Sequence, residues 1–131
     1  NELINNRNIP SSYYQKICTS HKCYLKEITK LRQEGITING LCHITGGGLI
    51  ENPPRILPDG LTINWDEGAL NEMMPDYFSY LQEIGNISQT EMRRTFNCGI
   101  GMLVVVEPKY SMSVLELITN SRVVGTIEPV E

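Results

Sequence analysis

The residues best suited to chemistry in this chain gather around three successive glycines, Gly46, Gly47 and Gly48. Because glycine has no Cβ atom, its backbone can adopt positive φ values and approach a ligand within hydrogen-bonding distance. If Gly48 begins a short helix, the free N–H groups at the start of that helix favour an anion. We therefore predict that Thr45 and the three glycines form a phosphate-binding loop. A plain tight turn is the alternative.

The polar side chains beside the glycines each admit two roles. Thr45 can add a hydroxyl to the same anion or cap the following helix. His43, our catalytic candidate, can shuttle a proton near neutral pH or hydrogen-bond a backbone carbonyl. Glu51 and Asn52 can hold a substrate amide or a ribose hydroxyl, or they can fix the loop to Arg55 or to neighbouring backbone. Arg55 can neutralise a phosphate or pair with Glu51, four residues earlier.

A second group of candidates lies where a predicted helix runs into a predicted buried strand: Thr95, Asn97, Gly99 and Gly101. Glycine inside a strand marks a bulge or a close approach of another backbone. Either this strand lines a nucleotide cleft, or a helix packs tightly over the two glycines. We interpret the aromatic residues of the middle of the chain as core and surface residues rather than as a base-stacking platform: Trp65, Tyr77, Phe78 and Tyr80.

Bulk properties restrict the class of protein. With 131 residues and 14.8 kDa, the chain fits one domain with a real core. The net charge is −4 and basic residues form no long stripe, so we do not expect nucleic acid as a partner. The longest apolar run covers residues 100–106, far short of the roughly 18 residues that span a bilayer. We therefore expect no membrane segment.

The cysteines and the start of the chain bear on its origin. Cys18, Cys23, Cys42 and Cys98 form no C-x-x-C pair, so we expect reduced thiols in a cytoplasmic protein and no metal site. The polar residues 1–10 lack the order of a secretory signal. Because the chain begins with Asn1 rather than Met, we expect a processed or truncated piece of a longer protein.

The spacing of apolar residues predicts the elements that position these groups. Residues 1–12 are expected to be a disordered lead-in, residues 13–23 a strand or a helix, and Gly35 the residue after a helix from Tyr24. Residues 36–44 are β-rich with a bulge at Gly40, or a turn there. Residues 66–72 are expected to be a loop and residues 55–58 a turn. Further helices are expected over 49–52, 76–84, 88–95 and 112–118, and strands over 61–65, 98–106 and 123–127. This order predicts an α+β fold in which helices cover a mostly antiparallel sheet.

Two segments together resemble the signatures of one enzyme family. Residues 43–55 read H-I-T-G-G-G-L-I-E-N-P-P-R and resemble H-I-T-G-G-G-x-x-E-N-x-P-R of aminoimidazole ribonucleotide synthetase, also called phosphoribosylformylglycinamidine cyclo-ligase. Residues 92–102 read M-R-R-T-F-N-C-G-I-G-M and resemble that family's M-x-x-T-F-N-x-G-x-G-M. Segments 57–60 and 81–87 also follow the family. The resemblance covers nearly the whole chain, from about residue 24 to its end.

The resemblance implies that residues 13–131 are the carboxy-terminal domain of an enzyme about twice this length or more. It implies a layered α+β domain that is partly ferredoxin-like. The absent amino-terminal domain would hold most of the ATP and Mg²⁺ site and the interface of a homodimer. The whole enzyme would use ATP to close a phosphorylated ribonucleotide, formylglycinamidine ribonucleotide, into aminoimidazole ribonucleotide in purine biosynthesis. The isolated chain is expected to fold but to turn over poorly.

The chain departs from the family pattern at two places. Residues 20–24 read S-H-K-C-Y where the family has P-T-R-I-Y, and Lys22 cannot reproduce the bidentate fork of an arginine. Pro53 replaces an apolar residue. Two alternatives remain: a related enzyme such as formylglycinamidine synthetase, selenophosphate synthetase or thiamine-phosphate kinase, and a non-catalytic phosphate-binding module.

Overall fold

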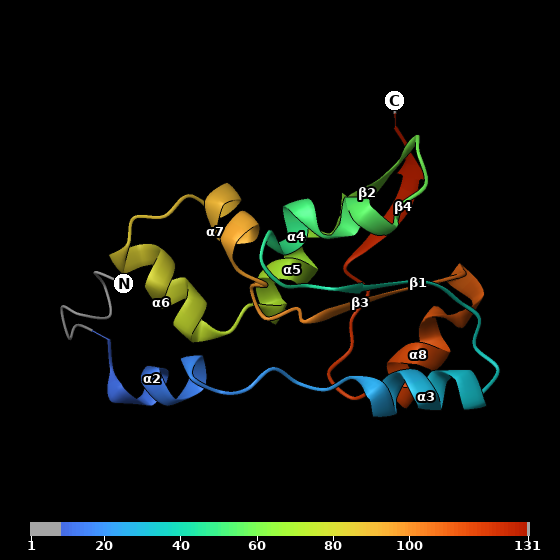
Figure 1. Cartoon of the computed structure of the whole chain (residues 1–131), viewed down its shortest axis with the longest axis horizontal. Helices are drawn as coiled ribbons and strands as arrows, with labels where there is room; N and C mark the ends of the chain where they lie inside the picture. Colours follow the sequence, from blue (N-terminus) through green and yellow to red (C-terminus); the bar gives the residue numbers. More distant parts are fainter. Residues whose placement is uncertain (1–8, 131) are drawn as a thin grey trace.

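The computed structural model describes residues 9–130, and Figure 1 shows how their elements are arranged. The first half contains helices α2 (Ser11–Ile17), α3 (Leu25–Gln33) and α4 (Gly48–Glu51), the 3₁₀ helix η1 (Pro53–Ile56), and strands β1 (Ile38–His43) and β2 (Leu61–Trp65). The second half contains helices α5 (Glu67–Met73), α6 (Asp76–Ile84), α7 (Gln89–Thr95) and α8 (Ser111–Leu117), the 3₁₀ helix η2 (Pro108–Tyr110), and strands β3 (Met102–Val106) and β4 (Gly125–Pro129).

The four strands of the described residues pair as two separate antiparallel sheets. β1 pairs with β3 so that His43 lies opposite Met102, and the register shifts between Ile38 and Gly40, which confirms the predicted bulge. β2 pairs with β4, and this second ribbon projects from the rest of the molecule in Figure 1. The α+β class is confirmed, but the single sheet that we expected is wrong, because alternation identifies a strand without identifying its partner. The layering and the ferredoxin-like arrangement remain predictions.

Most predicted helices are present, and one was missed. Helix α5 (Glu67–Met73) lies where we expected a loop over residues 66–72. Gly68 and Asn71 weaken the helical pattern there, but Asp66 accepts a hydrogen bond from the N–H group of Ala69 at 2.9 Å as a helix cap. Ala69 and Leu70 then lie buried, so packing decides the conformation. Ser88 caps α7 in the same way, since its hydroxyl oxygen accepts a hydrogen bond from the N–H group of Glu91 at 3.2 Å.

Several boundaries differ from the predictions. Ser11 and Ser12, which we placed in a disordered lead-in, begin helix α2, while residues 1–8 lie outside the described residues. The helix expected over residues 49–52 runs from Gly48 to Glu51, and Asn52 keeps helical backbone angles where the chain continues into η1. The predicted strand over 98–106 begins only at Met102, after a turn. No helix among the described residues is long and apolar enough to cross a membrane.

The core fixes both ends of the glycine segment. Ile44 is 0% exposed and Leu49 is 4% exposed, and both belong to one buried cluster. Burying a side chain of this size stabilises the folded state by about 1.5–3 kcal/mol. Trp65 packs against the same cluster, which confirms its core role. The remaining members of the cluster come from three elements and the turn before β3: Cys42, Leu70, Ile100 and Leu103.

Candidate functional site

The glycine segment forms a tight turn that leads into α4. The N–H group of Gly48 donates a hydrogen bond to the carbonyl oxygen of Thr45 at 3.0 Å, and Gly47 has a φ of 97° as the residue before the helix. Among the described residues, the N–H groups of Gly46 and Gly47 make no hydrogen bond with the protein. The loop can therefore offer two free backbone donors to a ligand, rather than the three that the glycines suggested.

Asn52 holds this turn together. Its side chain is buried, and its Nδ2 donates to the carbonyl oxygens of Gly46 at 3.1 Å and of Gly48 at 2.9 Å. Its Oδ1 accepts a hydrogen bond from the hydroxyl of Thr45 at 3.3 Å. Of the two roles considered for Asn52, the structure shows the one that fixes the loop. The capping alternative for Thr45 is wrong, because α4 begins after Gly47 and has no side-chain cap.

The two signature segments meet at Gly48. A Cβ atom on Gly48 would overlap the carbonyl oxygen of Arg93 and would lie 2.6 Å from that of Phe96. Gly48 also has a φ of 53°, a region that other residues rarely adopt. Only glycine therefore fits where α4 touches the end of α7, and this contact places the glycine turn beside the second motif.

Two adjacent arginines of α7 reach different partners. Arg94 Nε lies 3.9 Å from Glu51 Oε1, with about half of each side chain exposed. Glu51 therefore pairs with Arg94, and the predicted alternative pairing with Arg55 is not the one that the structure shows. Arg55 is exposed on η1. Arg94 was not among the predicted site residues, although it stands in the second motif directly before Thr95.

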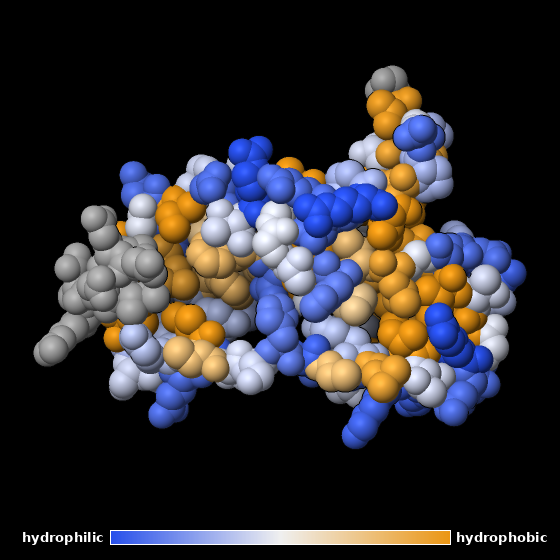
Figure 2. Space-filling view, in the orientation of Figure 1, coloured by the Kyte–Doolittle hydropathy of each residue, from blue (hydrophilic) through white to orange (hydrophobic). Residues whose placement is uncertain are grey.

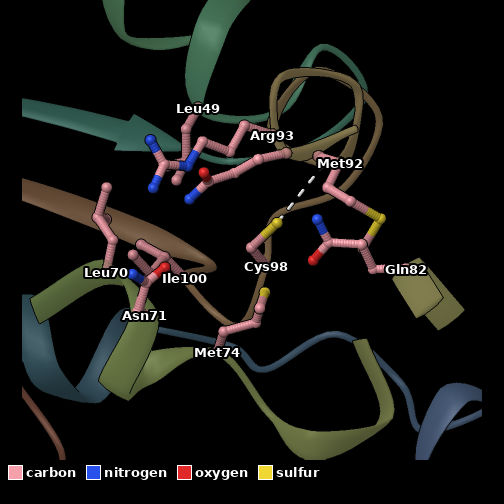
Figure 3. A pocket seen from close by; sticks show the side chains of 10 residues that line it. Leu49, Leu70, Asn71, Met74, Gln82, Met92, Arg93, Cys98 and Ile100 are labelled. Atoms are coloured by element: carbon pink, nitrogen blue, oxygen red, sulfur yellow. Dashed lines mark hydrogen bonds between the residues drawn. The ribbon is translucent and has the colours of Figure 1, made fainter. Parts of the chain in front are cut away.

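Arg93 is one of the residues that line a small cavity, which Figure 3 shows from close by. Its guanidinium donates two hydrogen bonds to the Glu67 carboxylate, one of them 2.7 Å long. This pairing raises the pKa of Arg93 and lowers the pKa of Glu67. The buried thiol of Cys98 donates to the carbonyl oxygen of Met92 at 3.6 Å, and burial raises its pKa. The cavity volume is about 20 Å³, which suits a water molecule and not a nucleotide.

The candidates at the end of α7 are engaged with their own neighbourhood. The hydroxyl of Thr95 donates to Glu91 Oε1 at 2.8 Å, and Oδ1 of Asn97 accepts from the N–H group of Gly99 at 3.0 Å. Gly101 is buried beneath the ring of Tyr24, whose hydroxyl would overlap any Cβ atom there. The tight-packing interpretation of this segment therefore agrees with the structure, although a tyrosine rather than a helix covers Gly101.

His43 is exposed at the end of β1 and lies in a group of three rings. It alternates with the buried Cys42 and Ile44, so its exposed ring lies with those of His21 and Tyr24, at centroid distances of 5.6 and 6.5 Å. Lys22 joins this group, because its Nζ lies 5.3 Å from the centroid of the Tyr24 ring and 2.6 Å from Glu27 Oε1. That ion pair raises the pKa of Lys22 and lowers the pKa of Glu27.

No group of three histidine, cysteine or acidic residues within 9–130 is arranged to hold a metal ion. The four cysteines are free thiols. The donors that the site does present are the N–H groups of Gly46 and Gly47, since the Thr45 hydroxyl already donates to Asn52 Oδ1. Such donors suit phosphoryl oxygens.

Comparison with known proteins gives a consistent result. Residues 19–131 match the family model described as AIR synthase related protein, C-terminal domain. The chain is 54% identical over 85 residues to the phosphoribosylformylglycinamidine cyclo-ligase of Methylobacillus flagellatus, a match that covers 65% of this chain and 24% of that protein. It is 45% identical over 100 residues to the cyclo-ligase of Chromobacterium violaceum, covering 76% of this chain and 28% of that protein.

The match extends to a multifunctional protein. The trifunctional purine biosynthetic protein adenosine-3 of Chironomus tentans is 41% identical over 116 residues, which are 88% of this chain and 8% of that protein. The chain thus spans about a quarter of the length of the cyclo-ligases that it matches.

Proposed function

Since the chain belongs to the family of AIR synthase related proteins and matches its C-terminal domain, we propose that it acts as part of a phosphoribosylformylglycinamidine cyclo-ligase. That enzyme uses ATP to convert formylglycinamidine ribonucleotide into aminoimidazole ribonucleotide, ADP and phosphate. The names of the relatives support this proposal, because they include the cyclo-ligase itself and a trifunctional purine biosynthetic protein.

One structural observation carries the proposal. The two signature segments are more than 35 residues apart in sequence, yet Gly48 of the first lies against the carbonyl oxygens of Arg93 and Phe96 in the second. The N–H group of Ile44 also donates to the carbonyl oxygen of Gly101 at 2.9 Å. A family signature that gathers at one place in the fold is what a shared substrate site requires, since catalysis depends on positioning.

In this proposal the chain's own residues bind and orient the substrate. The free N–H groups of Gly46 and Gly47 hold phosphoryl oxygens. Asn52, which accepts from the Thr45 hydroxyl and donates to the Gly46 carbonyl oxygen, keeps these donors in place. The half-exposed carboxylate of Glu51 accepts hydrogen bonds from the substrate's N–H or hydroxyl groups.

The other candidates act at the edges of the site. Arg55, exposed on η1, neutralises a phosphate held by the amino-terminal domain of the same enzyme. His43 supplies or accepts a proton at an imidazole nitrogen during ring closure. Thr95 and Asn97 keep the end of α7 in the shape that Gly48 contacts.

The rest of the enzyme completes the site. We propose that an amino-terminal domain of the same enzyme binds ATP and Mg²⁺ and provides the interface of a cytoplasmic homodimer. When bound there, ATP activates the substrate's amide oxygen by phosphorylation. The small share of the relatives' length that this chain covers supports a role that depends on further chain.

A direct experiment tests this function. The 131-residue chain, given formylglycinamidine ribonucleotide, ATP and Mg²⁺, should form no aminoimidazole ribonucleotide. Fused in place of the corresponding segment of the Methylobacillus flagellatus cyclo-ligase, it should restore turnover, and the segment-deleted enzyme is the control. A correctly folded fusion that binds ATP but never turns over would contradict the proposal. Robust turnover by the chain alone would contradict the division of labour between the domains.

A further inference from the structure

The two adjacent arginines of α7 are held with very different strength. Successive residues of a helix point about 100° apart, so Arg93 and Arg94 face different neighbours. Arg93 is only 17% exposed and donates two hydrogen bonds to Glu67. Its guanidinium also lines the cavity in Figure 3, so it is fixed as a structural link between α5 and α7.

Arg94 has no such anchor. Its Nε lies 3.9 Å from Glu51 Oε1, beyond hydrogen-bonding distance, and 53% of its side chain is exposed. Among the described residues, its guanidinium donates no hydrogen bond. Exposed ion pairs of this kind contribute little stability, so Arg94 can change its partner at small cost.

The partner of Arg94 lies directly on the glycine turn. A Cβ atom on Gly47 would be 2.9 Å from Oε2 of Glu51, whose other carboxylate oxygen faces Arg94. The guanidinium is therefore separated from the Gly47 α-carbon by the width of one carboxylate. Figure 2 shows hydrophilic side chains over the region where α4 and α7 lie, so a ligand reaches this place from solvent.

We propose that Arg94 is a phosphate-binding residue of this site, and that Glu51 holds its guanidinium beside the glycine turn until a phosphoryl group replaces the carboxylate. The inference rests on the proposed function and extends it by naming the side-chain cation of the site. A guanidinium can bind two phosphoryl oxygens at once through parallel N–H groups. Its present contact with Glu51 is a single, longer one, so a phosphoryl group would be the better partner. Gly47, whose N–H group is free, lies next to that position, since a Cβ atom on it would be 2.9 Å from Glu51 Oε2.

The consequences for binding have opposite signs at the two residues. Removing the guanidinium with Arg94→Ala should weaken phosphate binding at least about tenfold, the loss expected for a charge-assisted hydrogen bond. Glu51→Gln removes a negative charge that competes for Arg94 and repels the ligand. Its amide oxygen still accepts the hydrogen bonds proposed for Glu51, so it should strengthen binding several-fold. Both side chains are about half exposed, so neither substitution should prevent folding.

Titration of the ¹⁵N-labelled 131-residue chain with ribose 5-phosphate and, separately, with ATP tests the proposal. The measured quantities are the chemical shifts of the Gly46 and Gly47 amides and of the Nε–H group of Arg94. These shifts change even when binding is weak. Matched controls carry the same charge change on exposed helix positions that lie across the β1–β3 pair: Arg32→Ala on α3 and Glu116→Gln on α8. Both controls should bind as the unaltered chain does.

The outcomes separate the two sources of phosphate and decide the proposal. A selective loss of ribose 5-phosphate binding in Arg94→Ala supports a substrate phosphate at Arg94, and a selective loss of ATP binding supports the transferred phosphate. The proposal is overturned if the unaltered chain binds neither ligand, or if Arg94→Ala binds both as the unaltered chain does. Turnover by the fused enzyme tests the proposed function independently, so the two can fail separately.

Discussion

Gly48 lies directly against the main chain of Arg93, so closely that a Cβ atom at residue 48 would overlap the Arg93 carbonyl oxygen. This contact joins the glycine turn to the end of α7. It also explains why the third glycine is needed for packing, while the first two keep their N–H groups free for a ligand.

Replacing Gly48 should therefore cost much more stability than replacing Gly46. Gly48→Ala places a methyl group on two carbonyl oxygens at a positive φ, and we expect it to lower the free energy of unfolding by about 2–4 kcal/mol. Gly46→Ala meets no atom within 4 Å and should change stability by less than about 1 kcal/mol. Urea unfolding followed by circular dichroism measures both. Equal losses in the two variants would contradict the packing role of Gly48.

Asn52 should prove a positioning residue rather than a ligand. Asn52→Asp keeps the acceptor for the Thr45 hydroxyl but removes the donors to the carbonyl oxygens of Gly46 and Gly48. It also buries a carboxylate, so we expect a loss of about 2–4 kcal/mol in the free energy of unfolding. The control is Asn39→Asp at an exposed position of β1. Unchanged stability together with lost phosphate binding would instead make Asn52 a direct contact.

The ion pair between Glu67 and Arg93 should make stability depend on pH in acid. Arg93 lowers the pKa of Glu67, so the pair stabilises the fold above the carboxyl's unfolded pKa of about 4.3. This contribution is lost as the pH falls through the lower folded pKa. Because Glu67 is more than half exposed, we expect no more than about 1 kcal/mol.

The free energies of unfolding of the unaltered chain and of Glu67→Gln, measured between pH 7 and pH 3, check this sign. Their difference should be constant above about pH 5 and should shrink below pH 4. Glu83→Gln, at an exposed position of α6, serves as the control. A difference that grows on acidification would mean that the pair does not stabilise the folded state.

Two of the four thiols should react readily, and the other two should be protected. Cys18 and Cys23 are exposed, whereas Cys42 and Cys98 are buried, and burial raises the pKa of both buried thiols. Because the thiolate is the reactive form, we expect the buried pair to react at least about tenfold more slowly with a disulfide reagent. Mass spectrometry after timed labelling identifies each site, and labelling in urea should equalise them. Rapid modification of Cys98 in the folded chain would show that the cavity beside Arg93 opens readily.

Several elements were readable because local signals agreed. The helix α3 follows from its apolar spacing, and the bulge at Gly40 from a glycine inside a β-rich run. Helix α5 was missed because Gly68 and Asn71 oppose it locally, while the buried Leu70 favours it through a contact that sequence does not display. The separation of β2 and β4 into their own sheet was missed for a similar reason: the choice of strand partner is a long-range property.

The sequence by itself determined the family, the α+β class and the two segments where chemistry was to be sought, because these depend on residue identity and short spacing. Only the tertiary structure decided how these segments act together. It assigned Asn52 to the loop, left the N–H groups of Gly46 and Gly47 free, and placed Arg94 beside Glu51. Such roles depend on which side chains meet across the fold, and that is set by the packing of α4 against α7 around one buried core.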